Sequence, residues 1–205
     1  AGFTLIEMTV VLAIIVTITG IILTNQTSFN KTLVLANTAY DIALTLRSSQ
    51  TYGIGSRSFG GYTNMGYGLH FEITSPESFT LFADVSPAPR PSNCHGLPAG
   101  GADSPNAKRG DCTYQSTSER VKDYNLENNV YIQDFCIYAS GTWDCTLSSL
   151  DIVFARPNPD PFINGMINRK ACITISSRQD ISQRRFISVT ESGQITANAS
   201  SCLTS

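Results

Sequence analysis

The sequence has 205 residues, of which 15% are charged, and its net charge is −2. With an isoelectric point near 5.6, this balance argues against a protein built mainly to hold nucleic acid, which needs an excess of Lys and Arg. The low charge, together with abundant Ser, Thr and Asn, suits an exported protein. After an N-terminal helix of about 50 residues, roughly 150 residues remain, enough for one globular domain.

The chain starts with an apolar run from Phe3 to Leu23 in which Glu7 is the one charged residue. A helix of that length is about 31 Å long and can cross a bilayer core of about 30 Å. The run is too long for a secretory signal peptide, nothing basic precedes it, and no Ala-x-Ala cleavage site follows. A plain membrane anchor fits the length but leaves Glu7 unexplained, because a carboxylate costs roughly 2.5–3.5 kcal/mol at the centre of a bilayer.

The hexapeptide GFTLIE at residues 2–7 and the apolar helix after it resemble the N-terminus of type IV pilins and of the pseudopilins of type II secretion. The resemblance implies that a prepilin peptidase cuts between Gly2 and Phe3, so that Ala1 and Gly2 belong to the leader. It also implies N-methylation of Phe3. Glu7 would then meet the new amino terminus of a neighbouring subunit and set the register of a filament.

The apolar helix would form the core of that filament. The side chains expected to pack there are Leu5, Ile6, Val10, Val11, Leu12, Ile14, Ile15 and Ile18. Gly20, with Thr17 and Thr19 beside it, weakens the helix, since glycine costs about 1 kcal/mol in a helix interior. We expect local stretching or melting around residues 17–24 in a filament, and a close helix contact at Gly20 is an equally weighted alternative.

The sequence predicts one long helix over residues 3–52, with no proline before Pro76. Its second half has an apolar stripe at helical spacing, formed by Leu35, Ala39, Ile42, Ala43 and Leu46. We therefore expect the α+β fold of type IV pilins, in which the hydrophobic half of the helix protrudes and the other half packs against an antiparallel β-sheet. Residues 1–29 would be the transmembrane and filament-core half, and residues 30–205 the globular head, including the amphipathic half-helix 30–52.

Alternating apolar and polar residues predict the strands of that head. They cover residues 67–73, 78–83, 130–138, 151–154, 171–176, 185–190 and 194–197. The glycine-rich segment 53–66 lacks a Lys-Ser or Lys-Thr ending, which disfavours a phosphate-binding loop. Residues 86–111, rich in proline, predict a long irregular loop that is either a working surface or a tolerated insertion.

Six cysteines follow the membrane segment, and their even number indicates disulfides in an oxidising compartment. Fifteen connectivities are open, and proximity along the chain favours three local pairs. These are Cys94–Cys112, Cys136–Cys145 and Cys172–Cys202. No Cys-x-x-Cys pair occurs and the chain has two histidines, so neither a zinc site nor a cofactor is expected.

The C-terminal strands are similar to those of the GspH/FimT group of minor pseudopilins and pilins, at Ile152–Phe154, Ile173–Ile175 and Ile187–Gly193. Some members of that group bind DNA through a basic Gly-Arg-x-Arg turn, whereas this chain has the neutral sequence GQIT at 193–196. A basic cluster nearby is a candidate DNA contact, with a solvated sheet edge as the more ordinary alternative. Its members are Arg169, Lys170, Arg178, Arg184 and Arg185, of which Arg178, Arg184 and Arg185 are the candidate DNA-contacting residues.

Catalytic patterns are weak. Neither His70 nor His95 comes with a Gly-x-Ser-x-Gly elbow, and Asp160 with Asn164 is a thin basis for a calcium turn. The sequence therefore predicts a non-enzymatic structural subunit of a type IV pilus-like surface filament, serving adhesion, motility or DNA uptake. The alternative is a minor (pseudo)pilin of the GspH/FimT type in a type II secretion or DNA-uptake machine.

The expected partners are copies of the same chain and other pilins, the membrane before assembly, a prepilin peptidase, and a host or surface ligand. Nucleic acid remains an undecided partner. The expected location is a cell-surface filament (a pilus or fimbrium), preceded by a single-pass membrane form.

Overall fold

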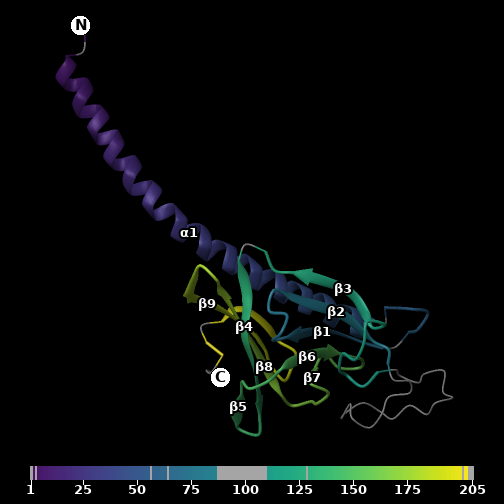
Figure 1. The fold of residues 1–205 in the computed structure, drawn as a ribbon. Helices are drawn as coiled ribbons and strands as arrows, with labels where there is room; N and C mark the ends of the chain where they lie inside the picture. Colours follow the sequence, from purple (N-terminus) through teal and green to yellow (C-terminus); the bar gives the residue numbers. More distant parts are fainter. Residues whose placement is uncertain are drawn as a thin grey trace, which may run out of the picture. The chain divides into compact units, whose positions relative to one another are not determined.

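The computed structural model describes residues 2, 4–55, 57–63, 65–86, 110–127, 129–199 and 201–202, and their side chains except those of residues 23–31, 198 and 199. The described chain forms one helix followed by strands (Figure 1). The elements are α1 (Leu5–Ile54), β1 (Gly66–Glu72), β2 (Ser78–Asp84), β3 (Arg120–Asn125), β4 (Val130–Ala139), β5 (Thr142–Asp144), β6 (Ser149–Phe154), β7 (Pro161–Ile163), β8 (Lys170–Ser177), β9 (Asp180–Val189) and β10 (Ile195–Ala199). By contacts the chain divides into two compact units, Ala1–Val34 and Leu35–Ser205.

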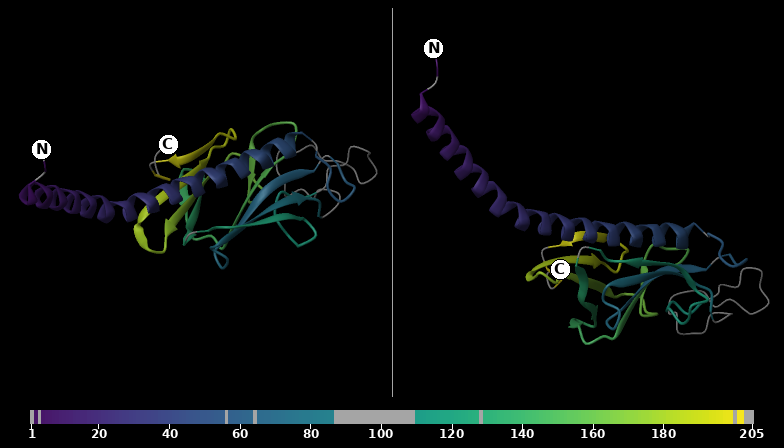
Figure 2. Two further views of the ribbon diagram at one scale, coloured as in Figure 1. Left: turned by 90° about the horizontal axis from the view of Figure 1, so that it is seen from above. Right: turned by 45° about the horizontal axis from the view of Figure 1, so that its top comes forward.

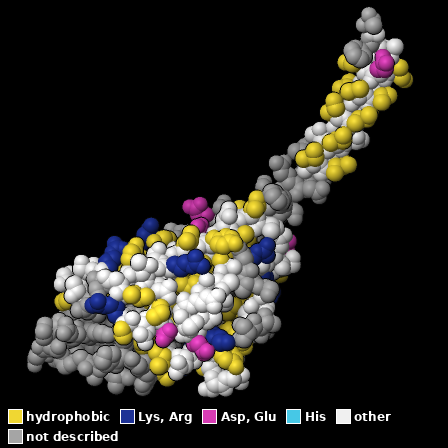
Figure 3. Space-filling view, turned by 180° about the vertical axis from the view of Figure 1, so that it is seen from behind, with side chains coloured by type: hydrophobic (Ala, Val, Ile, Leu, Met, Phe, Trp, Pro, Cys, Tyr) yellow, Lys and Arg dark blue, Asp and Glu magenta, His cyan; other side chains and the backbone are white. Residues whose placement is uncertain are grey.

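The first unit holds the apolar part of α1. Its segment Leu5–Ile22 has a mean hydropathy of 2.5, and by length and composition it could cross a membrane. Hydrophobic side chains cover the visible face of this part of the helix (Figure 3). The predicted division between residues 29 and 30 remains a prediction.

In the second unit, the rest of α1 carries the predicted apolar stripe, and all five of its side chains are at most 3% exposed. The end of the helix lies directly on β6. A Cβ added to Gly53 would stand 2.0 Å from the carbonyl oxygen of Phe154, so glycine permits this close approach. Further along, Arg47 donates to the carbonyl oxygen of Ile195, which places the helix beside β10 as well (Figure 2).

The strands form two five-stranded antiparallel sheets, which confirms the predicted antiparallel β-sheet domain and shows that it is divided in two. Sheet I has the order β3-β2-β1-β6-β7, and sheet II has the order β10-β9-β8-β4-β5. The two sheets meet where Ile132 of β4 donates to the carbonyl oxygen of Pro76, in the turn between β1 and β2. The α+β architecture, with a long N-terminal helix on antiparallel strands, is the one implied by the resemblance to type IV pilins.

Three strands were not predicted, and each of them lies at the edge of a sheet. β3 and β7 are the two edges of sheet I, and β5 is an edge of sheet II. Edge strands tolerate charge and proline because one side of their backbone forms no ladder. This explains the mostly exposed sequence RVKDYN in β3 and the proline that begins β7.

Candidate functional site

Glu7 closes a capping box at the start of α1. Its Oε2 accepts hydrogen bonds from the backbone N–H of Thr4 at 2.7 Å and from the Thr4 hydroxyl at 2.8 Å. In return, the Glu7 N–H donates to Thr4 Oγ1 at 3.4 Å. Such a reciprocal pair satisfies backbone donors that the first turn of a helix leaves free. Both bonds to the carboxylate use Oε2, so Oε1 keeps its capacity to accept from a cation.

The residues around Glu7 bear on processing. Gly2 has open space around it, with nothing within 4 Å of an added Cβ, whereas Phe3 lies outside the described residues. Cleavage after Gly2 and methylation of Phe3 therefore remain predictions.

The predicted packing side chains of the apolar segment are available on all sides of the helix. Their exposed fractions run from 50% for Val11 to 83% for Leu5. Full burial of an aliphatic side chain of this size is worth about 1.5–3 kcal/mol when it comes from water. The segment can thus pack against apolar surroundings in any direction.

The predicted weak point around Gly20 is helical in the single chain. Thr17 donates its hydroxyl to the carbonyl oxygens of Ala13, at 3.0 Å, and of Ile14, at 2.9 Å. Thr19 lies in the same unbroken helix, and nothing stands within 4 Å of a Cβ added to Gly20. Melting or close contact here concerns a filament and remains a prediction.

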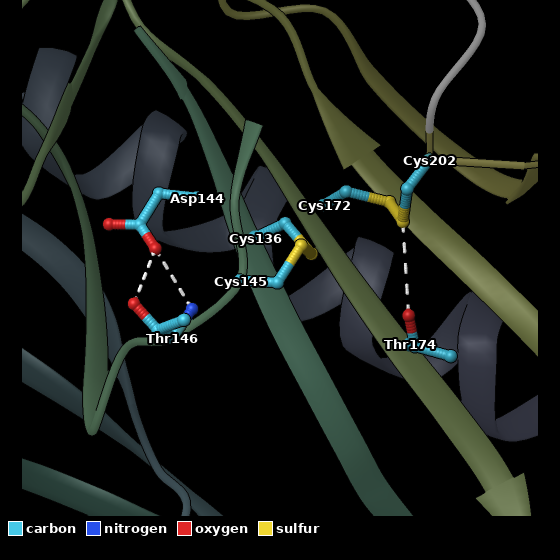
Figure 4. The surroundings of a disulfide bond; sticks show 7 residues. All are labelled: Cys136, Asp144, Cys145, Thr146, Cys172, Thr174 and Cys202. Atoms are coloured by element: carbon cyan, nitrogen blue, oxygen red, sulfur yellow. Dashed lines mark hydrogen bonds between the residues drawn. A yellow bond between two sulfur atoms is a disulfide. The ribbon is translucent and has the colours of Figure 1, made fainter. Parts of the chain in front are cut away.

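Two disulfides are formed in the described chain, and they match two of the locally favoured pairs (Figure 4). Cys136–Cys145 ties β4 to the end of β5, and Cys172–Cys202 ties the C-terminal tail to β8. Cys112 is also disulfide-bonded, and its predicted partner Cys94 lies outside the described residues.

The three candidate DNA-contacting arginines have different surroundings. Arg178 pairs with Glu77, with 2.6 Å between Nη2 and Oε1, and it lies over the Tyr131 ring at 5.2 Å. Arg178 therefore links the β8–β9 turn of sheet II to the β1–β2 turn of sheet I. The guanidinium groups of Arg184 and Arg185 instead donate to backbone carbonyls on their own strand.

The glycine turn before β10 also has a structural role. Gly193 has φ of 78°, and a Cβ there would stand 2.2 Å from the Pro159 carbonyl oxygen. Gln50 of α1 donates to the carbonyl oxygens of Gly193, at 3.1 Å, and of Pro159, at 3.2 Å. The neutral turn thus fastens sheet II to the helix.

Buried carboxylates, which the sequence analysis did not single out, hold the segment after residue 109 against β2. Asp84 accepts from the backbone N–H groups of Asp111 and Cys112, both at 2.9 Å. Glu119 accepts from the backbone N–H groups of Val85, Ser86 and Gln115. The carboxylate oxygens of Asp84 and Glu119 already accept from backbone N–H groups, so these two side chains serve to hold the backbone in place. Burial raises the pKa of Glu119, and those three amides act in the opposite direction.

His70, which is partly buried, and the buried Asp151 form a further pair, with 2.7 Å between Nδ1 and Oδ1. Burial raises the pKa of Asp151, and the hydrogen bond from His70 partly offsets that effect. The ring of Tyr114 packs on His70 with 4.6 Å between centroids. In the described part of the chain, no Ser, Thr or Cys side chain hydrogen-bonds to His70, so the pair has no nucleophile to activate there.

The turn considered for calcium uses its asparagine for the fold. Asn164 Oδ1 accepts from the backbone N–H of Asp151 at 2.7 Å, and Nδ2 donates to the carbonyl oxygen of Ser149. Both ends of this side chain therefore hold the turn to β6. Among the described residues, no three His, Cys, Asp or Glu side chains are grouped as metal ligands.

No protein-family model matches the sequence, and no curated protein matches it as a relative. Among solved structures, two crystal forms of the type IV minor pilin FimU from Pseudomonas aeruginosa are similar to this chain, each at 8% sequence identity. The TM-scores are 0.42 and 0.39. The similar regions cover 84% and 80% of this chain, and 93% and 92% of the FimU chains. At 8% identity, no residue-by-residue correspondence follows.

Proposed function

We propose that this chain is a non-enzymatic structural subunit of a type IV pilus-like surface filament, which polymerises through α1 and serves adhesion, motility or DNA uptake. The observation that carries the proposal is the position of Glu7. Within a prepilin-like hexapeptide, it caps the start of an apolar segment long enough to span a membrane. A plain anchor needs no carboxylate there.

The energetics of leaving the membrane explain why such a subunit needs Glu7. Lipid tails are as apolar as leucine, so moving the Leu5–Ile22 segment from lipid into a bundle of similar helices gains little hydrophobic free energy. Packing contacts drive the association but are weakly directional. A carboxylate that meets a cationic amine is satisfied in one register and costly in the others.

The partner we propose for Glu7 is the amino terminus of a neighbouring copy, created by peptidase cleavage after Gly2 and methylated at Phe3. Oε1 is the oxygen available to accept from it, because Oε2 is held by Thr4. A secondary amine at neutral pH carries a positive charge, so the bond would be charge-assisted and short.

The test is to replace Glu7 in the native cell. Glu7→Ala removes both the cap and the charge, whereas Glu7→Gln keeps an oxygen that can cap Thr4 but removes the charge. We expect both variants to accumulate in the membrane and to yield at least tenfold fewer sheared filaments by electron microscopy and immunoblotting. Thr9→Ala, a neutral change two residues away on the opposite side of the helix, should assemble normally. Normal filaments from Glu7→Gln would remove charge pairing from the mechanism.

The alternative is a minor subunit of a type II secretion or DNA-uptake machine. It is favoured by the similarity to the GspH/FimT group, whose matching segments form β6, β8 and β9. The two roles differ in copy number. Mass spectrometry of sheared filaments should find this chain as the main component if it is a major subunit. A trace amount beside another main component would assign it the minor role.

A further inference from the structure

We propose that the tip of the β8–β9 hairpin, residues 178–185 and here called the hairpin tip, binds the anionic surface of the membrane in which α1 is anchored. The proposal rests on the anchoring part of the proposed function and does not depend on filament assembly. Four features support it: a braced bulge, an exposed isoleucine, two arginines that pair with no carboxylate among the described residues, and the place of the tip in the domain.

The hairpin tip is a built bulge. Ser177 pairs with Asp180, but the next pair is Ser176 with Arg184, so residues 181–183 are additional on β9. The buried Ser176 hydroxyl donates to the carbonyl oxygens of Gln183, at 3.1 Å, and of Ile181, at 3.5 Å.

The outer side of the bulge is braced too. Asp180 Oδ1 accepts from the backbone N–H of Ser182 at 3.1 Å and from its hydroxyl at 2.6 Å. The extra residues are therefore held in one arrangement from both sides.

This arrangement presents an apolar side chain next to positive charge. Ile181 is 64% exposed, and burying it would gain about 1.5–3 kcal/mol. Arg184 is exposed and Arg185 half-buried, and their guanidinium groups donate to the carbonyl oxygens of Ile181 and Arg184. Among the described residues neither arginine has a carboxylate partner, whereas Arg178 is paired with Glu77.

The hairpin tip lies at the end of the sheet domain where α1 enters it. Gln50 contacts Gly193 and Arg47 contacts Ile195, so β10 runs along α1 toward the helix N-terminus. β9 is antiparallel to β10 and returns from that end. In β8, Ala171 pairs with Val189, and the strand extends about 20 Å from Ala171 to Ser177 at the tip. Over a similar length of about 18 Å, α1 runs from Arg47 to Leu35.

By these lengths the tip reaches about as far along α1 as Leu35, and Figure 2 shows the yellow-green hairpin beside the helix. From Leu35 the sequence continues to the apolar span. The hairpin tip is consequently at the end of its own domain where α1 enters.

An apolar apex flanked by arginines fits the interface of an anionic bilayer. The isoleucine can enter the headgroup boundary while the guanidinium groups bind lipid phosphates. Each basic residue near such a surface contributes about 1 kcal/mol. Two arginines and one isoleucine are too few to recruit a free protein, but they suffice for a chain that α1 already holds on the bilayer, because the contact is then intramolecular.

The phosphates of DNA would meet the same arginines. The affinity of a protein for DNA grows with the number of phosphates that its basic side chains neutralise. The two arginines of the hairpin tip could neutralise only a small number. The exposed isoleucine has no role in a phosphate contact. The observations therefore favour lipid over nucleic acid.

The test uses the full chain in vesicles. Trp143 is the one tryptophan of the sequence, so the double variant Trp143→Phe, Ile181→Trp places a single fluorophore at the tip. With brominated acyl chains in a mixture of phosphatidylcholine and phosphatidylglycerol, we expect quenching of at least a third of the tip fluorescence. We expect that quenching to fall at least threefold in pure phosphatidylcholine, in 0.5 M salt, or on adding Arg184→Ala and Arg185→Ala.

Matched controls fix the meaning of each result. Arg120→Ala with Lys122→Ala removes two basic residues from β3 and should leave the quenching unchanged, and Trp143 in the otherwise native chain should stay unquenched. Vesicle flotation reports α1 separately. A chain that does not float contradicts the anchoring function, whereas a floating chain with no quenching overturns the tip proposal alone. Salt-sensitive binding of duplex DNA through Arg184 and Arg185, without quenching, would overturn it in favour of nucleic acid.

Discussion

Single residues explain how the segment after residue 109 is held. Gly110 has φ of 94°, and a Cβ at this position would stand 2.0 Å from the carboxyl carbon of Asp84. The glycine therefore lets the backbone amides of the next two residues reach that carboxylate. Partners of this kind could not be read from the sequence, because the carboxylate and the amides lie on distant parts of the chain.

A prediction at this scale concerns Asp151. His70→Phe keeps an aromatic ring on Tyr114 but removes the hydrogen bond that offsets the burial of Asp151, although the Tyr114 amide still donates to it. We expect the already raised pKa of Asp151 to rise further, measured by carbon NMR titration of the labelled carboxyl group. Asp144, whose pKa is lowered by Thr146, provides the internal control and should not move. An unchanged Asp151 titration would show that His70 does not stabilise the carboxylate.

The same shift sets a pH dependence of stability. A carboxyl whose pKa is raised on folding holds more protons in the folded than in the unfolded state, between its ordinary value of 3.8 and the raised one. The contribution of Asp151 to the free energy of unfolding is therefore fully present below that window and is lost as pH rises through it. In His70→Phe this window extends to higher pH.

At the scale of elements, the two disulfides hold segments that few β-ladder hydrogen bonds hold, namely the C-terminal tail and the short β4–β5 hairpin. Cys172 lies in a central strand of sheet II, and Cys202 belongs to the tail beyond β10. Cys136 and Cys145 close the short β4–β5 hairpin, whose ladder has three residue pairs. Cys136 and Cys172 face each other across β4 and β8, so both bridges stand side by side on sheet II (Figure 4).

The two bridges should differ in what they contribute. In the chain-entropy description, a bridge across the 30-residue separation of Cys172–Cys202 restricts the unfolded chain more than one across the 9-residue separation of Cys136–Cys145. We expect Cys172→Ser with Cys202→Ser to cost about 3–4 kcal/mol, and Cys136→Ser with Cys145→Ser about 1 kcal/mol less. Urea unfolding of both double variants measures the difference. Equal losses, or the reverse order, would show that strand packing outweighs loop entropy here.

At the scale of the whole molecule, α1 belongs to two units that experience different surroundings. Its first part is apolar all round and its second part has one buried stripe. One continuous helix can therefore present an apolar surface all round at one end and pack one stripe on the sheet domain at the other.

This division predicts where the chain can be cut. A fragment of residues 35–205 keeps the whole buried stripe, so it should be soluble and unfold cooperatively, at a temperature within a few degrees of the full chain in detergent. A fragment of residues 47–205 loses Leu35, Ile42 and Leu46 with the rest of the stripe and should not fold. Circular dichroism melts of the two fragments compare them directly. A folded 47–205 fragment would show that the helix is dispensable to the sheets.

Much of this arrangement could be predicted from local pattern. The apolar stripe from Leu35 to Leu46, the central strands and two of the cysteine pairs follow from periodicity and spacing, and the structure confirms them. The edge strands β3, β5 and β7 could not be predicted, because exposed edges carry no apolar alternation. The difference between Arg178 and its neighbours Arg184 and Arg185 also could not, because it depends on where Glu77 lies.

The sequence by itself determined the chemistry that is local along the chain: the prepilin-like start with Glu7, the membrane-length apolar segment, and the amphipathic half of α1. These depend on residues within one or two helical turns of each other, so composition and period are enough. The tertiary structure decided the rest: the division of the strands into two sheets, carboxylates that accept from distant amides, and a bulge that exposes Ile181 beside two arginines. These depend on strand register between distant segments, which a local pattern does not specify.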